Sequence, residues 1–180
     1  MNKQLAFAAL TVKAYDDEKR EFSGIATTPT PDKVRDVVEP SGATFTLPIP
    51  MLAGHKHDKP IGEVYEARVT KAGIEYKARI PKVDELGAFK ERVDTAWQEI
   101  KYGVVKGVSI GFAAIEHAML PSGGIHFKKW RWDELSTVAI PAQAEATISA
   151  IKSAYAADSE CQAATGNMAT EEATQAATPA

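Results

Sequence analysis

One serine of this chain lies within a Gly-x-Ser-x-Gly pattern, with Ser109 at the centre of "GVSIG". This pattern is typical of the nucleophile elbow of an α/β-hydrolase, where the serine occupies a sharp turn between a strand and a helix. A serine hydroxyl is a weak nucleophile near neutral pH, so it needs a general base, most often histidine, and usually a third group that orients the base. The pattern also fits a serine on a glycine-flanked strand.

Four histidines are available as the general base. His55 and His57 lie in "GHKHDKPIG", whereas His117 and His126 flank a hairpin turn and are interpreted as surface residues. Imidazole and carboxylate also bind zinc, so His55, His57 and Asp58 form a candidate metal site. No H-E-x-x-H or comparable motif supplies a further ligand, so the sequence predicts neither a metal nor a cofactor. A polar loop without function is the remaining interpretation of this cluster.

An acid that could orient the histidine is Glu134, in "WRWDELSTVAIPA". A carboxylate just ahead of an apolar strand can accept a hydrogen bond from imidazole and fix its tautomer. The alternative is a solvated turn acid beside Asp133. Arg131 is a weaker candidate, as a helper at the oxyanion site.

The elements that must position these residues are mostly strands. Alternating patterns predict strands in "LAFAALTVKAYD" and "REFSGIATT", a hairpin in "EVYEARVTKAGIEYKARI", and a second hairpin from "VKGVSIGFAAIEH" to "IHFKKWRWDELSTVAIPA". "PTPDKVRDVVEPSGATF" predicts a long loop with one helical turn. "LPIPMLAGHKHDKPIG" carries prolines around its two histidines and predicts an irregular or edge segment.

One stretch, "DELGAFKERVDTAWQEIKYG", changes to a helical period. Asp84 is predicted to cap this helix and Gly103 to end it. Its apolar residues recur at steps of three and four and therefore share one helix face: Leu86, Phe89, Val93, Trp97 and Ile100.

This order of elements argues against an α/β-hydrolase. Strands do not alternate with helices, and the serine strand continues into a hairpin rather than a helix. In that fold the acid and the histidine both follow the serine, in that order, and no histidine here follows Glu134. Gly107 and Gly111 are therefore interpreted as clearing space around a strand-borne Ser109.

Composition narrows the function classes. The chain has 180 residues, a net charge of −3 and one cysteine, Cys161. We therefore expect no disulfide, no nucleic-acid partner, no membrane span and a reducing, cytosolic location. Residues 1–153 are predicted to form one domain. Residues 154–180, rich in Ala, Thr and Glu, are predicted to be a disordered linker or processing region.

Three motifs in order carry a resemblance: a histidine five residues before Pro-Ile-Gly, a Ser-Ile-Gly-Phe strand, and a Glu-x-Ser-x-Val-x-x-Pro-Ala run. Together they resemble the prohead maturation proteases of tailed phages related to HK97, over roughly residues 5–150. Position by position, the resemblance implies Ser109 as nucleophile, His55 as base and Glu134, ahead of Ser136, as the third member. His57 remains an alternative base.

The resemblance implies further properties. The fold would be an antiparallel β-barrel of about seven strands with surrounding helices, similar to the herpesvirus capsid-maturation proteases. The activity would be that of a serine endopeptidase acting on capsid scaffolding segments and on itself, inside the immature prohead in the cytoplasm of a bacterial host. Herpesvirus proteases are active as dimers, so a homodimer is implied by analogy alone. A capsid assembly or scaffolding protein that keeps this fold without activity is the alternative.

Overall fold

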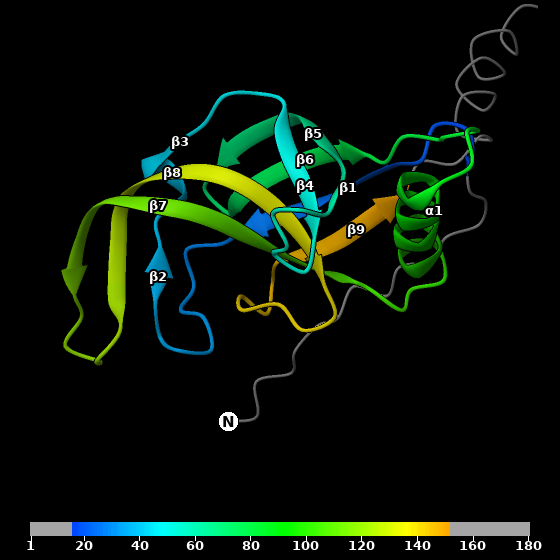
Figure 1. Cartoon of the computed structure of the whole chain (residues 1–180). Coiled ribbons are helices and arrows are strands. Elements are labelled where there is room, and N and C mark those ends of the chain that lie inside the picture. The colour runs from blue at the N-terminus through cyan, green and yellow to red at the C-terminus, as the bar shows by residue number, and fades with distance from the viewer. Residues whose placement is uncertain (1–15, 152–180) are drawn as a thin grey trace, which may run out of the picture.

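Strands dominate the computed structural model, which describes residues 16–151 (Figure 1). The elements are, in chain order, β1 (Glu21–Thr27), β2 (Val37–Val38), a 3-10 turn η1 (Pro40–Gly42), β3 (Ala43–Thr44), β4 (Ile49–Ala53), β5 (Pro60–Thr70), β6 (Gly73–Arg79), α1 (Ala88–Lys101), β7 (Gly107–Met119), β8 (Ile125–Val138) and β9 (Thr147–Ile151).

Seven of these strands close a barrel. The order runs β8, β4, β5, β6, β1, β9, β7, and β7 pairs again with β8. The predicted barrel of about seven strands is therefore confirmed. Its pairings are antiparallel except that between β4 and β8, which is parallel, as are those of the short strands β2 and β3 with β8. The predicted first strand and the tail beyond residue 153 lie outside the described residues.

The barrel interior is filled by the alternate residues of its strands, as the period of two requires. Along β6, for example, Ile74, Tyr76 and Ala78 are buried while Lys77 and Arg79 are exposed. Tyr76 packs edge-on against Phe22 of β1, its neighbour in the sheet. The largest wholly buried side chain, Trp130 of β8, packs edge-on against Phe112 of β7.

One segment differs from the sequence-based prediction. Ile49–Ala53 is not irregular or at an edge: it is β4, a full barrel strand between β5 and β8. The exposed side chain of Pro50 points away from the core, whereas Ile49, Met51 and Leu52 are buried. This strand leads directly into the loop that carries His55, so it positions the candidate base.

The predicted helix is present, but it begins later than expected. Its N-cap is Gly87 rather than Asp84, and Leu86 lies before the helix with 87% of its surface exposed. Gly103, with a φ of +68°, follows the C-cap as predicted. The buried face of α1 consists of Val93, Ala96, Trp97 and Ile100.

The β7–β8 hairpin reaches well beyond the barrel, on the side away from α1 (Figure 1). The predicted long loop supports this arm: β2 and β3 pair with the outer half of β8, and the single turn η1 lies between them. The part of the hairpin nearest the barrel holds the two remaining candidate site residues.

An ion-pair cluster joins α1 to the turn before β1 and makes a stability prediction. The buried guanidinium of Arg20 donates to Asp94 at 2.7 Å, and Lys90 donates to the same carboxylate at 2.6 Å. Lys90 and then Arg20 lower the pKa of Asp94 by hydrogen bonding. A carboxylate whose pKa is lower in the folded state stabilises the fold above its unfolded pKa, and this contribution is lost as pH falls through the folded pKa.

Asp94→Asn is therefore expected to be less stable than the unchanged chain at pH 7. This difference in the free energy of unfolding should shrink as pH falls below about 4, the usual pKa of an aspartate. Urea unfolding of both chains between pH 7 and pH 3 measures it. A difference that stays constant across this range would contradict the prediction.

Candidate active site

The pairing of β7 with β8 places four residues of the site on one face. Ser109 lies opposite Ser136, and Gly111 lies opposite Glu134. Directly opposed residues of an antiparallel pair point to the same side of the sheet, as do residues two apart on one strand. The other face, carrying Val108, packs into the core. Ser109, Gly111, Glu134 and Ser136 therefore share the outward face.

A β-bulge turns Glu134 to this face. Gly111 pairs with Glu134 and Phe112 with Trp132, which leaves Asp133 as an extra residue on β8. Without the extra residue, Trp132 and Glu134 would point to the same side; with it, Trp132 enters the core while Glu134 faces outward. The Trp132 indole N–H donates to the Glu134 carbonyl at 2.7 Å and closes the bulge.

The loop after β4 brings His55 to this carboxylate. Gly54 and His55 both have a φ of +60°, a turn that reverses the chain directly after the strand. The Gly54 N–H donates to the Thr137 carbonyl at 3.1 Å, so the turn is held against β8. His55 Nδ1 then lies 2.6 Å from Glu134 Oε1. The sequence-predicted base and acid are thus in direct contact although 79 residues separate them.

This contact fixes the tautomer that a general base needs. An ionised carboxylate only accepts hydrogen bonds, so the proton between the two groups belongs to His55 Nδ1. Nε2 is then left with a lone pair that can take a proton. The histidine side chain is 44% exposed while that of Glu134 is 6% exposed, so the acid is sheltered and the imidazole is accessible.

Ser109 is half-buried, and its hydroxyl makes no hydrogen bond to His55 or to another side chain within residues 16–151. Its register places it on the face of the His55–Glu134 pair, but the nucleophile–base bond is not formed in this structure. Hydrogen bonds of this kind are often long or absent without substrate.

The alternative residues lie elsewhere. Exposed His57 makes no contact with Glu134 in the described part of the chain, so the geometry favours His55 as the base. His117 is exposed, as expected, and His126 is half-buried beside Glu39. Arg131 is exposed and paired with Asp133, and its pairing with Ala113 places it on the outward face of β8, further along the hairpin than Glu134. Its role as a helper at an oxyanion site stays a prediction.

Two residues of the site were not recognised from the sequence for what they do. Gly111 makes room for the acid rather than for the serine: a Cβ there would lie 2.2 Å from Glu134 Oε1. Gly107, by contrast, makes room for the ring of Pro141. Ser136 is completely buried and hydrogen-bonded to both partners of the histidine–acid pair. The only sequence signal for Ser136 was its place in the Glu-x-Ser-x-Val run.

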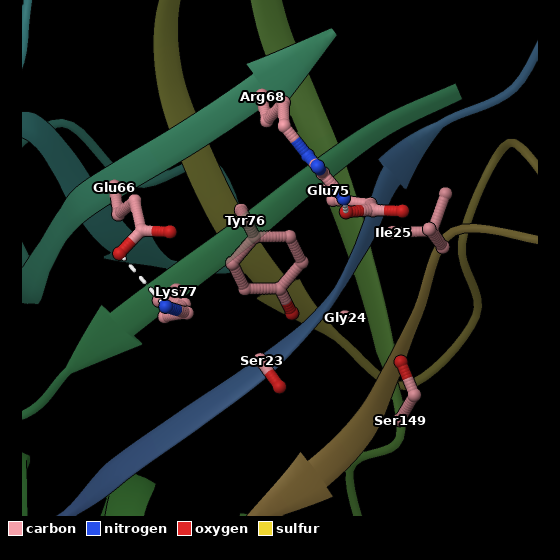
Figure 2. A pocket seen from close by; sticks show the side chains of 9 residues that line it. All are labelled: Ser23, Gly24, Ile25, Glu66, Arg68, Glu75, Tyr76, Lys77 and Ser149. Carbon is pink, nitrogen blue, oxygen red and sulfur yellow. Dashed lines mark hydrogen bonds and ion pairs between the residues drawn. The ribbon is translucent and has the colours of Figure 1, made fainter. Parts of the chain in front are cut away.

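A hollow of about 550 Å³ lies on another part of the barrel wall, over β1, β5, β6 and β9 (Figure 2). It is lined by serines and by two ion pairs, Lys77 with Glu66 and Arg68 with Glu75. It contains no histidine, so it lacks the base that serine chemistry needs. Within residues 16–151 we find no group of three or more potential ligands that could hold a metal, and no helix with the length and apolar character to cross a bilayer.

The barrel and its outward-facing serine, histidine and glutamate define a candidate serine hydrolase. Residues 9–160 match the family described as Caudovirus prohead serine protease, and the chain belongs to this family. The sequence-based resemblance is thereby confirmed.

Two phage proteins are similar to the chain. It is 54% identical over 167 residues to the capsid polyprotein of Pseudomonas phage PAJU2, covering 92% of this chain and 25% of that protein. It is 29% identical over 156 residues to the prohead protease of Escherichia phage T5, covering 79% of this chain and 70% of that protein. The chain thus spans about a quarter of the length of the polyprotein and more than two thirds of the T5 protease.

Among solved structures, the chain is similar to the KSHV protease in complex with a hexapeptide phosphonate inhibitor. The TM-score is 0.46 at 16% identity, over 72% of this chain and 63% of that one.

Proposed function

We propose that this chain is a serine endopeptidase that cleaves capsid scaffolding segments, and itself, during prohead maturation. Ser109 is the nucleophile, His55 the general base and Glu134 the group that orients the base. One observation carries the proposal: His55 Nδ1 lies 2.6 Å from the sheltered carboxylate of Glu134, on the sheet face that carries Ser109. A histidine held in this way leaves Nε2 free to accept the serine proton.

The reaction proceeds in two halves. His55 Nε2 takes the Ser109 hydroxyl proton while Oγ attacks the scissile carbonyl, and the imidazolium then gives this proton to the leaving amine as the peptide bond breaks. Water, deprotonated by the same nitrogen, attacks the acyl-enzyme, and the proton returns to Ser109 as the ester bond breaks. Glu134 stabilises the imidazolium in both halves through Nδ1–H.

The relatives support the proposed substrate and location. A protein named capsid polyprotein contains a region 54% identical to this chain as about a quarter of its length. In that relative, a region similar to this chain is therefore part of a capsid polyprotein. Capsid-protein segments inside the prohead, in the host cytoplasm, are the proposed substrates, and a homodimer remains a proposal from the resemblance.

A non-catalytic assembly protein is the second candidate. It is favoured by one observation: the Ser109 hydroxyl has no hydrogen bond to His55 in the described residues. A protein without activity has no need of an oriented base, however. The pairing of His55 with Glu134 therefore favours the enzyme.

Covalent labelling separates these candidates without knowledge of the cleavage sequence. A fluorophosphonate transfers its phosphonyl group to an activated serine: the Oγ–P bond forms as fluoride leaves. We expect one label per chain, located on Ser109 by mass spectrometry of the peptides, and no label after prior heat unfolding. Absence of labelling in the folded protein would support the assembly protein, and a label on another serine would overturn the assignment of the nucleophile.

A further inference from the structure

The hydroxyl of Ser136 both accepts and donates a hydrogen bond, and both partners belong to the proposed site. The residue is fully buried on β8. The His55 backbone N–H lies 2.9 Å from Ser136 Oγ, and since an N–H can only donate, the hydroxyl oxygen accepts. The hydroxyl proton is then free to point to Glu134 Oε2, which lies 2.7 Å away. One hydroxyl thus joins the backbone of the candidate base to the side chain of the candidate acid.

The first of these bonds holds a strained residue. His55 has a φ of +60°, in the left-handed region that is unfavourable for a residue with a Cβ. Such conformations persist where the surroundings over-determine them. The bonds that hold this turn on β8 are those from the Gly54 N–H to the Thr137 carbonyl and from the His55 N–H to Ser136. Ser136 therefore helps to fix the position of the His55 backbone, from which the imidazole extends.

The second bond sets the direction of the acid. Glu134 has two carboxylate oxygens, and each has one partner: Oε2 accepts from Ser136 and Oε1 contacts His55. With Oε2 held, rotation about the last bond of the side chain would break a buried hydrogen bond that involves a charged group. Oε1 is thereby kept on His55 Nδ1.

Ser136 is also excluded as a second nucleophile. It lies directly opposite Ser109 on the neighbouring strand and on the same face of the hairpin. Position alone therefore does not show which of the two serines is the nucleophile. The hydroxyl of Ser136 is inaccessible and its proton is already donated to a carboxylate, whereas Ser109 is half-buried with an uncommitted hydroxyl in the described structure. The two serines are therefore suited to different tasks.

We propose that Ser136 is a positioning residue of the active site, which holds both the backbone of His55 and the carboxylate of Glu134 so that the base keeps its orientation. This inference rests on the proposed function, but it makes a separate statement: the geometry of the His55–Glu134 pair depends on a residue that touches no substrate.

Ser136→Ala tests this role. We expect the rate constant for labelling by fluorophosphonate to fall by about 100-fold, the loss that follows when a catalytic group is misplaced by about an ångström. The far-downfield proton resonance of His55 Nδ1–H, identified by its absence in Glu134→Gln, should broaden or disappear. Ser136→Thr, which restores a hydroxyl, should regain part of the labelling rate wherever its thermal unfolding shows a folded chain.

The matched control is Thr28→Val. Thr28 also has a buried hydroxyl that donates to a glutamate oxygen at 2.7 Å, Glu145 Oε2, but it lies directly after β1. We expect this variant to lose comparable stability while its labelling rate and its Nδ1–H resonance are retained. A merely structural Ser136 would behave in the same way as Thr28.

The outcomes are distinct. If Ser136→Ala is labelled within threefold of the unchanged rate and keeps the resonance, the positioning role is wrong. If the unchanged chain is not labelled at all, the proposed function fails, but the resonance still reports the histidine–acid pair. Its persistence in folded Ser136→Ala would then overturn the positioning role, and its loss would support it.

Discussion

Ser109→Ala is expected to reduce proteolysis by a factor on the order of 10⁴ to 10⁶, because the acyl-enzyme cannot form without the nucleophile. Ser109 is half-buried and makes no side-chain hydrogen bond in the described structure, so its removal should leave the melting temperature nearly unchanged. Co-expression with a capsid protein, followed by mass spectrometry of both chains, measures the loss of scaffold and self cleavage.

His55→Ala should cause a loss of similar size, and the double variant should be no worse than either single one. Residues that act as a unit in one chemical step are strongly non-additive, since removing one member already disables the step. This non-additivity is the sharper test, because two residues with unrelated roles would multiply their effects.

Ser23→Ala and His57→Ala are the matched controls. Ser23 is a half-buried, strand-borne serine like Ser109, but it lies on β1 in the hollow that has no histidine (Figure 2). His57 is exposed and lies two residues from His55. Both variants should retain cleavage. Cleavage that survives in Ser109→Ala, or that is lost in His57→Ala instead of His55→Ala, would contradict the assigned roles.

Local patterns were sufficient to predict much of this molecule from the sequence. Alternation predicted β1 and the two hairpins, and the helical period predicted α1, because each pattern reports the burial of neighbouring side chains along one element. The helix start was wrong because Leu86 continues the apolar spacing yet lies before the N-cap and is exposed. Spacing alone does not reveal where packing ends.

Long-range pairing was the part that the sequence could not provide. The prolines of "LPIPMLAGHKHDKPIG" indicated an edge, but a parallel partner, β8, and an antiparallel one, β5, make Ile49–Ala53 a central strand. The bulge at Asp133 has no sequence signature, although it alone turns Glu134 toward Ser109. Serine is likewise a common residue type, and Ser136 matters because it bonds to His55, which lies 81 residues away in the sequence.

Gly111→Ala should disable the site without touching any of its three proposed members. A Cβ on Gly111 would lie 2.2 Å from Glu134 Oε1 and 2.7 Å from the carboxyl carbon, both shorter than real Cβ contacts. The carboxylate must then move, and any movement breaks its bonds to His55 and Ser136. We expect the fluorophosphonate labelling rate to fall at least 100-fold, and the stability to fall by about 1–3 kcal/mol through overpacking.

Gly107→Ala provides the control on the same strand, and Glu134→Asp provides a partial reversal. A Cβ at Gly107 would crowd Pro141 at 2.7 Å, away from Glu134, so this variant should lose stability with far less effect on labelling. Shortening the acid withdraws the carboxylate from the new methyl group. The double variant Gly111→Ala with Glu134→Asp should therefore lose less unfolding free energy than the two single variants lose together, because the two residues are in contact. Additive stabilities would show that the new methyl group does not press on Glu134. A Gly111→Ala chain labelled at the unchanged rate would contradict the role of the His55–Glu134 pair in catalysis.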